Sequence, residues 1–431
     1  MRELISVAVL VALLVWRRHF VALAPLAQYA GYFLMTDALP MDRKFLIGYA
    51  EALVLLIYAR QVLSEKRGLL SDRMALILVL MPWLAAPALL FAKENRSQAL
   101  FIIVLLSLSG FLYRYFVTNM PGLLASSIFD RVAALWLAFG VVTKATEGLL
   151  YGATYDPTRG AFSYAVLSRS GGMGGSNLVG QILLMMLPLI QGKILIAVTV
   201  VFLLLTFSRG VYVVLATVLL FMTITGKTLG RTTVRMAIGA ACAAILLLNA
   251  VPENLRADII DLGESRLVGI SGVSTQERLI NRYSVDEGRS YMADEAMRIW
   301  GATDFQGIGL GGFFWGEALV GNAPEFSNAH NVYLTLLAEG GLIVAAAFVA
   351  ILLFTIRRAF LFDKRAAISL VAFALYGLFS GEIYETAGIV SLAPYYPLLL
   401  VFAYVAAGRG SSASVHVSGG AGIRDSRRPT W

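Results

Sequence analysis

Apolar stretches long enough to cross a lipid bilayer recur along almost the whole chain, and short polar loops separate them. A helix that spans a bilayer needs roughly 17 to 25 mostly apolar residues. Inside lipid the backbone must satisfy its own polar groups, which a helix does within one segment. The pattern therefore predicts an all-α fold, a polytopic transmembrane helical bundle of about 12 spans. We expect these spans near residues 19–36, 45–63, 74–92, 99–117, 122–143, 177–191, 193–208, 210–225, 236–252, 331–356, 366–387 and 389–407.

The short loops predict how this bundle is oriented. Lysine and arginine gather in residues 64–73, 226–235 and 357–365, and counting helices places these three loops on one side. Cytoplasmic loops of membrane proteins carry an excess of lysine and arginine. We therefore expect this side to be cytoplasmic, together with the arginine-containing tail after residue 407.

Two longer segments fall on the opposite side, one near residues 144–176 and one over residues 253–330. The second contains twelve acidic residues, six arginines and no lysine. A segment this long within a compact bundle is usually functional. The expected organisation is transmembrane helices over residues 1–252, a structured periplasmic loop over 253–330, C-terminal transmembrane helices over 331–407 and a disordered cytoplasmic tail over 408–431.

The composition agrees with a membrane protein, because 58% of the residues are hydrophobic and 14% are charged. Soluble domains carry about 25% charged residues. The net charge of +8 resides mostly in the short loops, so it indicates membrane topology rather than nucleic-acid binding. Cys242 is the single cysteine, which excludes a disulfide within the chain. One cysteine and three dispersed histidines argue against a histidine or thiolate metal site, although magnesium held by carboxylates stays open.

His330 stands directly before a long apolar run and is a candidate general base. The positive end of a helix dipole disfavours imidazolium and so favours the neutral ring. A neutral histidine can accept a proton. The alternative is that His330 merely caps the helix or lies at the lipid interface.

Arginines supply the candidate anion-binding groups. Arg209 lies between two apolar runs, and helix counting places it on the same side as His330. Arg282 and Arg289 lie in the acidic segment, and the planar guanidinium is suited to binding phosphate oxygens in pairs. The alternatives are that Arg209 reaches lipid phosphate at the interface and that the loop arginines form ordinary surface ion pairs.

The order and spacing of several short motifs resemble those of the O-antigen ligase and polymerase superfamily of bacterial inner-membrane enzymes. The resemblance covers roughly residues 170–360 and extends weakly to the segment 176–189. The motifs are Ser208-Arg209-Gly210, Gly288-Arg289, Gly307-Ile308-Gly309 with Phe313, His330-Asn331 with Tyr333-Leu334, and Ala338-Glu339-Gly340-Gly341.

The resemblance implies an inverting, metal-independent glycosyltransferase that needs no cofactor. Its donor would be a glycan linked to undecaprenyl diphosphate, and its acceptor a hydroxyl of lipid A-core or of another glycan. By matched position His330 would be the general base, Arg209 and Arg289 would hold the diphosphate, and Asn331 would contact substrate. Arg282 competes with Arg289 for the role of the loop arginine. The expected site lies on the periplasmic face of the bacterial inner membrane.

Within this superfamily, an O-antigen ligase of lipopolysaccharide biosynthesis is favoured over an O-antigen or exopolysaccharide polymerase. A transporter or flippase of polysaccharide or lipid is an alternative of another class, because it would also be a basic bundle of many helices. Charged residues near the bilayer midplane would favour it. The candidates for such a role are Glu51, Arg60, Arg114, Asp130 with Arg131, Glu382 and Glu385.

Overall fold

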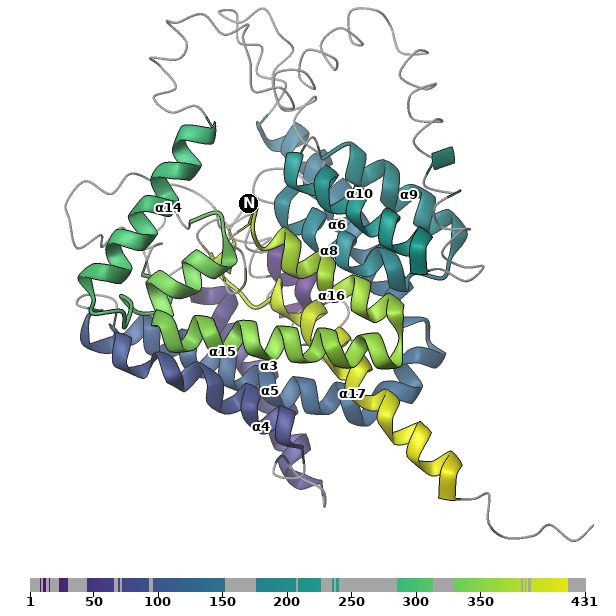
Figure 1. Ribbon diagram of the computed structural model, residues 1–431, viewed down its shortest axis with the longest axis horizontal. Helices are drawn as coiled ribbons and strands as arrows, with labels where there is room; N and C mark the ends of the chain where they lie inside the picture. Colours follow the sequence, from purple (N-terminus) through teal and green to yellow (C-terminus); the bar gives the residue numbers. More distant parts are fainter. Residues whose placement is uncertain are drawn as a thin grey trace, which may run out of the picture.

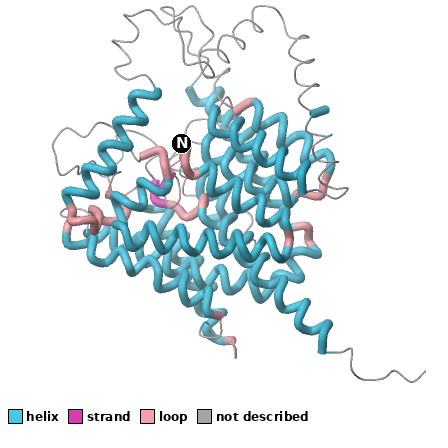
Figure 2. The backbone as a smooth tube through the Cα atoms, viewed as in Figure 1, coloured by secondary structure: helices cyan, strands magenta, loops and turns pink. Residues whose placement is uncertain are grey.

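The computed structural model is helical over nearly all of the residues that it describes, with a single short pair of strands (Figure 2). This confirms the predicted all-α helical bundle. The structure describes residues 8, 11–12, 15, 23–29, 45–65, 69, 72–92, 96–151, 176–206, 208–225, 235, 238–239, 285–312, 329–380, 383, 385–386 and 389–417.

A first group of helices comprises α3, α4, η3 and α5, drawn in purple and blue in Figure 1. α3 and α4 both pack on α5. α4 continues directly into the 3-10 helix η3, where Pro82 and Pro87 lack the backbone N–H that an α-helical turn would use. The bounds are Leu46–Ser64 for α3, Arg73–Leu80 for α4, Met81–Leu90 for η3 and Arg96–Ala125 for α5.

A second group comprises α6, α8, α9 and α10, which Figure 1 draws in blue for α6 and in teal for the other three. α6 contacts α8 and α9, and α10 contacts the same two helices. Asp130 in the first turn of α6 accepts the backbone N–H groups of Gln191 and Gly192 at 2.8 and 3.1 Å, which fixes the turn before α9. The bounds are Ile128–Tyr151 for α6, Ser176–Met186 for α8, Leu187–Leu189 for the 3-10 helix η4, Lys193–Leu204 for α9 and Arg209–Thr225 for α10.

One helix, α16, joins the two groups. It contacts α8 and α10 on one side and α15 and α17 on the other. α15 packs on η3 and on α14, and α17 packs on α5. The bounds are Val285–Ala302 for α14, Val332–Phe362 for α15, Lys364–Tyr376 for α16 and Tyr395–Val417 for α17.

Several predicted boundaries differ from the structure. α5 continues through Pro121 to Ala125 instead of ending near residue 117, and the chain reverses at Ser126 and Ser127. The predicted span 366–387 is wrong in length, because α16 ends at Tyr376. A two-residue hairpin follows, in which β1 (Glu385–Thr386) pairs antiparallel with β2 (Ile389–Val390). α17 begins at Tyr395 and continues to Val417, past the residue 408 at which we expect the tail to begin.

Four of the described helical segments are long and apolar enough to cross a membrane. They are α3, α4 together with η3, α5 and α15, whereas α8 with η4, α9, α10 and α17 contain shorter apolar segments. The chain is an integral membrane protein, and the number of spans stays a prediction. The predicted span 236–252 and most of the span 19–36 lie outside the described residues, as do residues 253–284 and 418–431.

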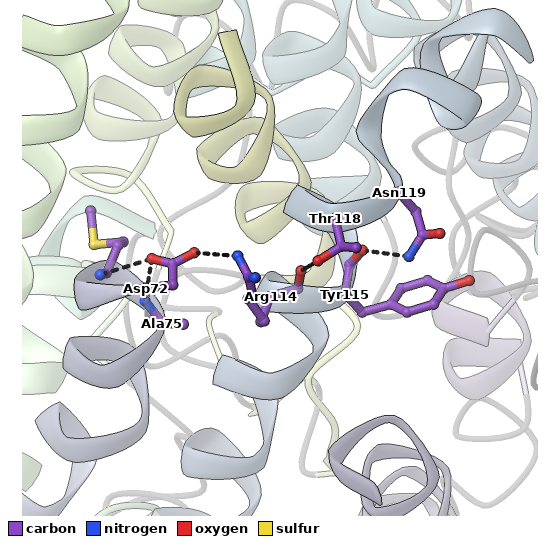
Figure 3. Close-up of polar contacts among 7 residues, drawn as sticks. Asp72, Ala75, Arg114, Tyr115, Thr118 and Asn119 are labelled. Atoms are coloured by element: carbon purple, nitrogen blue, oxygen red, sulfur yellow. Dashed lines mark hydrogen bonds and ion pairs between the residues drawn. The ribbon is translucent and has the colours of Figure 1, made fainter. Parts of the chain in front are cut away.

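Charged side chains cluster at one end of the bundle, where the loops rich in lysine and arginine begin. Figure 3 shows Asp72 capping α4 through the backbone N–H groups of Met74 and Ala75, while its second oxygen lies 3.4 Å from Arg114 of α5. Tyr113 lies within electrostatic range of this pair and of Arg358 near the end of α15. The predicted cytoplasmic loops 64–73 and 357–365 therefore start at the same end of the bundle.

Candidate functional site

His330 lies two residues before the first residue of α15, at the end of that helix opposite Arg358. Its side chain is partly exposed. Its φ angle of 49° lies in the left-handed region, which costs a residue with a side chain roughly 1 to 2 kcal/mol. Strained backbone of this kind gathers at functional sites. The placement at a helix start confirms the position predicted from the sequence, while the role of base is untested.

Asn331 is the N-cap of α15. Its Oδ1 accepts the backbone N–H groups of Tyr333 and Leu334 at 3.0 and 3.1 Å. The cap satisfies two of the donors that every helix start leaves open. A substrate contact of Asn331 would therefore have to come from its amide nitrogen.

The start of α15 is joined to the end of α16. The backbone N–H of Val332 donates to the carbonyl of Gly377 at 2.8 Å. One residue later, the Tyr333 hydroxyl donates to the carbonyl of Ala374 at 2.7 Å. These bonds hold His330 beside the last turn of α16.

Arg209, the first residue of α10, lies at the same end of α16. Gly210 packs so closely on Phe379 that a Cβ atom at residue 210 would lie 2.8 Å from the Phe379 Cβ. Only a glycine therefore permits this approach. A cation at a helix N-terminus is opposed by the helix dipole. The position of Arg209 at the start of α10 is explained if the site binds an anion, because both the helix dipole and the guanidinium attract one.

α8 also begins close to this end. A Cβ at Gly180, in its second turn, would lie 2.8 Å from Val211 Cγ2 of α10 and 3.8 Å from the Tyr376 hydroxyl of α16. The starts of α8, α10 and α15 thus surround the C-terminal end of α16. Three positive helix ends and Arg209 gathered here would attract an anion.

Two buried polar side chains in these elements were not predicted. Gln181 of α8 is 1% exposed, and neither its amide nitrogen nor its amide oxygen has a hydrogen-bond partner within the described chain. Ser380, four residues after the end of α16, is also 1% exposed, and its hydroxyl likewise has no partner. Gln181 sits in the weakly matching segment 176–189, which is the signal that could have identified it.

Of the two loop arginines, Arg289 lies within the described residues. Arg289 lies in α14, three residues before Met292 and seven before Ala296, so helical register places all three positions on one face. Met292 and Ala296 pack in a small apolar cluster with Ala329, the neighbour of His330. Position 289 is therefore one turn from the surface that contacts the start of α15. Arg282 lies outside the described residues.

The segment that follows α14 contacts α15 through close backbone approaches at glycines, and we call this contact the glycine brace. The backbone N–H groups of Ile308 and Gly309 donate to the carbonyls of Ala338 and Glu339 at 3.0 and 2.9 Å. Gly307 has a φ of 86°, and a Cβ there would lie 2.5 Å from the Glu339 carbonyl oxygen. The sequence therefore needs glycine here for close approach of two backbones.

The brace also breaks α15. Gly341 has φ 80° and ψ 178°, and a Cβ there would lie 2.4 Å from the Gln306 carbonyl oxygen. The fully buried Glu339 side chain accepts the backbone N–H of Gly311 at 2.8 Å through Oε2. The sequence predicted one uninterrupted helix over residues 331–356, and this break and the buried carboxylate were missed. Glycines 340 and 341 after Glu339 were the available signal.

The charged residues that favoured a transporter are largely occupied by structural contacts. Glu51 accepts the Ser391 hydroxyl at 2.9 Å and the backbone N–H of Leu392 at 2.8 Å. Arg114 pairs with Asp72, and Asp130 holds the turn before α9. Glu382 lies outside the described residues. No group of three or more histidine, cysteine or acidic side chains in the described part of the chain is arranged to hold a metal ion.

Residues 194–349 match a protein family described as O-antigen ligase. This segment of the chain is similar to that family. This confirms the resemblance that the sequence motifs indicated. No curated protein matches the chain in a sequence search.

The matched range contains every predicted site residue, namely Arg209, Arg282, Arg289, His330 and Asn331. It begins at the start of α9 and ends eight residues after the break in α15. α16 lies outside the O-antigen ligase match, although its C-terminal end contacts the segments that carry Arg209 and His330. The matched segment and α16 together contain the candidate site.

Proposed function

We propose that the chain is a membrane glycosyltransferase that moves a glycan from undecaprenyl diphosphate to an acceptor hydroxyl. The observation that carries the proposal is that the starts of α10 and α15, with Arg209 and His330, both pack against the C-terminal end of α16. The O-antigen ligase match points to the same class of enzyme and to lipid-linked glycans as substrates.

In the proposed reaction, neutral His330 accepts the proton of the acceptor hydroxyl as its oxygen attacks the anomeric carbon. The new bond forms between that oxygen and the anomeric carbon, while the bond from the anomeric carbon to the diphosphate oxygen breaks. Attack from the side opposite the leaving group inverts the configuration. A positioned general base contributes roughly 100- to 10,000-fold in rate.

Arg209 and Arg289 hold the diphosphate as negative charge develops on it. Cations fixed before the reaction stabilise such charge strongly, because they need not reorganise when it appears. The proposal assigns no step to a metal ion or cofactor. Arg282 is the competing candidate for the second arginine, and Asn331 would orient substrate through its amide nitrogen.

The site is proposed to face the periplasm of a bacterial inner membrane. The opposite end of the bundle carries Arg114, Arg358 and Arg365, in agreement with the excess of cations on the cytoplasmic side. The acceptor we favour is lipid A-core, which makes the chain an O-antigen ligase of lipopolysaccharide biosynthesis.

Mass spectrometry of lipopolysaccharide from a strain that lacks this chain tests the acceptor. Loss of all glycan-capped lipid A-core, with lipid-linked polymer retained, is the result expected for a ligase. Lipid A-core capped with single repeats would instead identify a polymerase.

Purified protein with a lipid-linked glycan donor tests the chemistry. The wild-type chain should transfer the glycan to an added acceptor, and the His330→Ala variant, inserted normally, should not. A wild-type protein that moves lipid-linked glycan across a vesicle membrane without transferring it would overturn the enzymatic proposal in favour of a transporter.

A further inference from the structure

Arg358, close to the C-terminal end of α15, has a hydrogen-bond donor that the protein does not use. Its Nε is buried and has no hydrogen-bond partner within the described part of the chain. The guanidinium carbon lies 5.4 Å from the centre of the Phe354 ring, one turn earlier in the helix. This ring and the negative end of the helix dipole stabilise the charge, but neither gives Nε an acceptor. The unused donor therefore indicates an acceptor from outside the chain.

Positive charge gathers around this donor. Tyr113 of α5 lies within electrostatic range of both Arg114 and Arg358, so the two guanidinium groups belong to one cluster. Asp72 lies 3.4 Å from Arg114 and also caps α4, as Figure 3 shows, and it neutralises one charge of the cluster. The exposed arginines next to Asp72 and Arg358 in the sequence are Arg73 and Arg357. The cluster therefore remains positive and favours an anion over water as the missing acceptor.

The aspartate that follows α15 is bound to other groups. Asp363 accepts Nη2 of Arg365 at 3.0 Å and the Tyr404 hydroxyl at 2.9 Å through its Oδ2. It also caps α16 through the backbone N–H of Arg365. Asp72 and Asp363, the aspartates that cap α4 and α16 at this end, are thus held by contacts that do not include Arg358.

The cluster borders an exposed apolar surface. α15 packs on η3 but hardly contacts α4. Close to Arg358, the side chains of Leu353 and Phe354 are accordingly 59% and 53% exposed. On α4, Ile77 and Leu80 are 46% and 54% exposed. A ligand at this place would meet positive charge at the helix ends and apolar side chains along the membrane-spanning segments.

We propose that Arg358 binds the phosphate of an anionic phospholipid whose acyl chains lie along the exposed apolar side chains of α15 and α4. The guanidinium is suited to phosphate oxygens, and the charges of the other arginines attract the headgroup. Basic sites between membrane helices bind anionic headgroups in this way. An amphipathic ligand accounts for both the cationic and the apolar part of the site, whereas inorganic phosphate or water accounts only for the cationic part.

The inference adds to the proposed function without depending on it. The lipid site lies at the end of α15 opposite His330. A phospholipid bound there joins α15 to α5 and α4, and so holds the helix that follows His330 against the first helix group.

Native mass spectrometry of the full chain in detergent tests the site. The protein is titrated separately with dioleoyl phosphatidylglycerol and with dioleoyl phosphatidylethanolamine, which has no net charge. Phosphatidylglycerol should bind the wild-type chain more tightly. Arg358→Gln should weaken its binding roughly tenfold, as expected for the loss of a charge-assisted hydrogen bond. The matched control is Arg131→Gln, which removes the same charge from an exposed residue in the first turn of α6 at the same end of the bundle.

Three results would overturn the proposal. They are equal binding of the two lipids, equal losses in the two variants, and displacement of phosphatidylglycerol by millimolar inorganic phosphate, which would indicate a site for a free anion. The thermal midpoint of the wild-type protein is a readout that needs no variant, and it should rise more with phosphatidylglycerol than with phosphatidylethanolamine. None of these measurements involves a glycan, so lipid binding without glycan transfer would leave this inference intact and remove the proposed function.

Discussion

The backbone N–H of Val332 donates to the carbonyl of Gly377 at 2.8 Å, and this bond fixes the start of α15 to the end of α16. Because Phe379 packs on Gly210, the same short stretch after α16 also contacts the start of α10. The proposed general base His330 and the guanidinium of Arg209 are 121 positions apart in the sequence. These contacts bring them to one end of one helix.

Two substitutions of His330 distinguish a loss of catalysis from a loss of stability caused by the left-handed backbone. His330→Asn should fold as well as the native chain, because asparagine tolerates the left-handed region that φ 49° requires. It should lose roughly 100- to 10,000-fold in transfer rate, because no base remains. Transfer of a lipid-linked glycan and the thermal midpoint in detergent are the two measurements.

His330→Ala is the matched control for this change. It should lose the same activity and in addition lose ~1 kcal/mol of stability relative to asparagine, since alanine disfavours the left-handed region. Full transfer by either variant would show that His330 is not the base.

Arg209→Lys tests whether the guanidinium geometry matters. Lysine keeps the charge but cannot bind two phosphate oxygens in parallel, so the loss should be about 1.5 kcal/mol or slightly more than tenfold in kcat/KM for the donor. Steady-state kinetics at varied donor concentration measure it. Unchanged kinetics for Arg209→Lys, with Arg131→Lys at the other end of the bundle as control, would count against a diphosphate contact.

Gly341→Ala should disrupt the brace between α14 and α15. The new Cβ would lie 2.4 Å from the Gln306 carbonyl oxygen, on a backbone with φ 80°. We expect a loss of at least about 2 kcal/mol in the free energy of unfolding, visible as a lower thermal midpoint. The control is Gly122→Ala in α5, where a Cβ meets nothing within 4 Å. The free energy of unfolding of this control should rise by roughly 0.5 to 1 kcal/mol. Equal effects at both positions would show that the close backbone contact at Gly341 does not stabilise the fold.

Glu51→Leu should destabilise the fold by about 1 to 3 kcal/mol, because the buried N–H of Leu392 loses its acceptor. Glu51→Gln is the milder control, since its amide keeps one oxygen for one of the two donors. Thermal unfolding of both variants in detergent measures the difference. A Glu51→Leu protein as stable as the native one would mean that the contact with Ser391 and Leu392 contributes nothing.

The junction of α15 and α16 should respond to acid. Burial of Asp363 would raise its pKa, but hydrogen bonds from the Arg365 side chain and backbone and from the Tyr404 hydroxyl outweigh burial and hold the pKa below its usual value. A carboxyl with a lowered folded-state pKa stabilises the fold above its unfolded pKa, and that contribution is lost as pH falls through the folded pKa. The thermal midpoint should therefore fall in this acidic window, and the Asp363→Asn variant should show a smaller fall. An identical pH dependence in both proteins would contradict this assignment.

The helix starts that carry the site could be predicted from the sequence because each depends on local signals. Arg209 and His330 interrupt apolar runs, and Asn331 is a typical N-cap residue. The first residues of α10 and α15 accordingly lie within one position of the predicted spans. Of the three basic loops, those at residues 64–73 and 357–365 begin at the same end of the bundle, as predicted, whereas residues 226–234 lie outside the described residues.

Contacts between distant segments could not be predicted in this way. Glu51 bonds to residues 391 and 392, and the Gly307 to Gly341 brace joins two helices through backbone approach, which leaves no apolar periodicity to detect. The end of α16 at Tyr376 was missed because the residues after it stay largely apolar while the helix stops. Gln181 lies inside an apolar run and reveals its unsatisfied amide only once its neighbours are known.

α16 has only 13 residues, yet it is wedged between the two helix groups. Any sliding of α8 and α10 past α15 must either carry this helix along or separate it from one side. The gap between Arg209 and His330 would then widen or close with the sliding. This one short helix thus sets the distance between the two helix starts that carry the proposed catalytic residues.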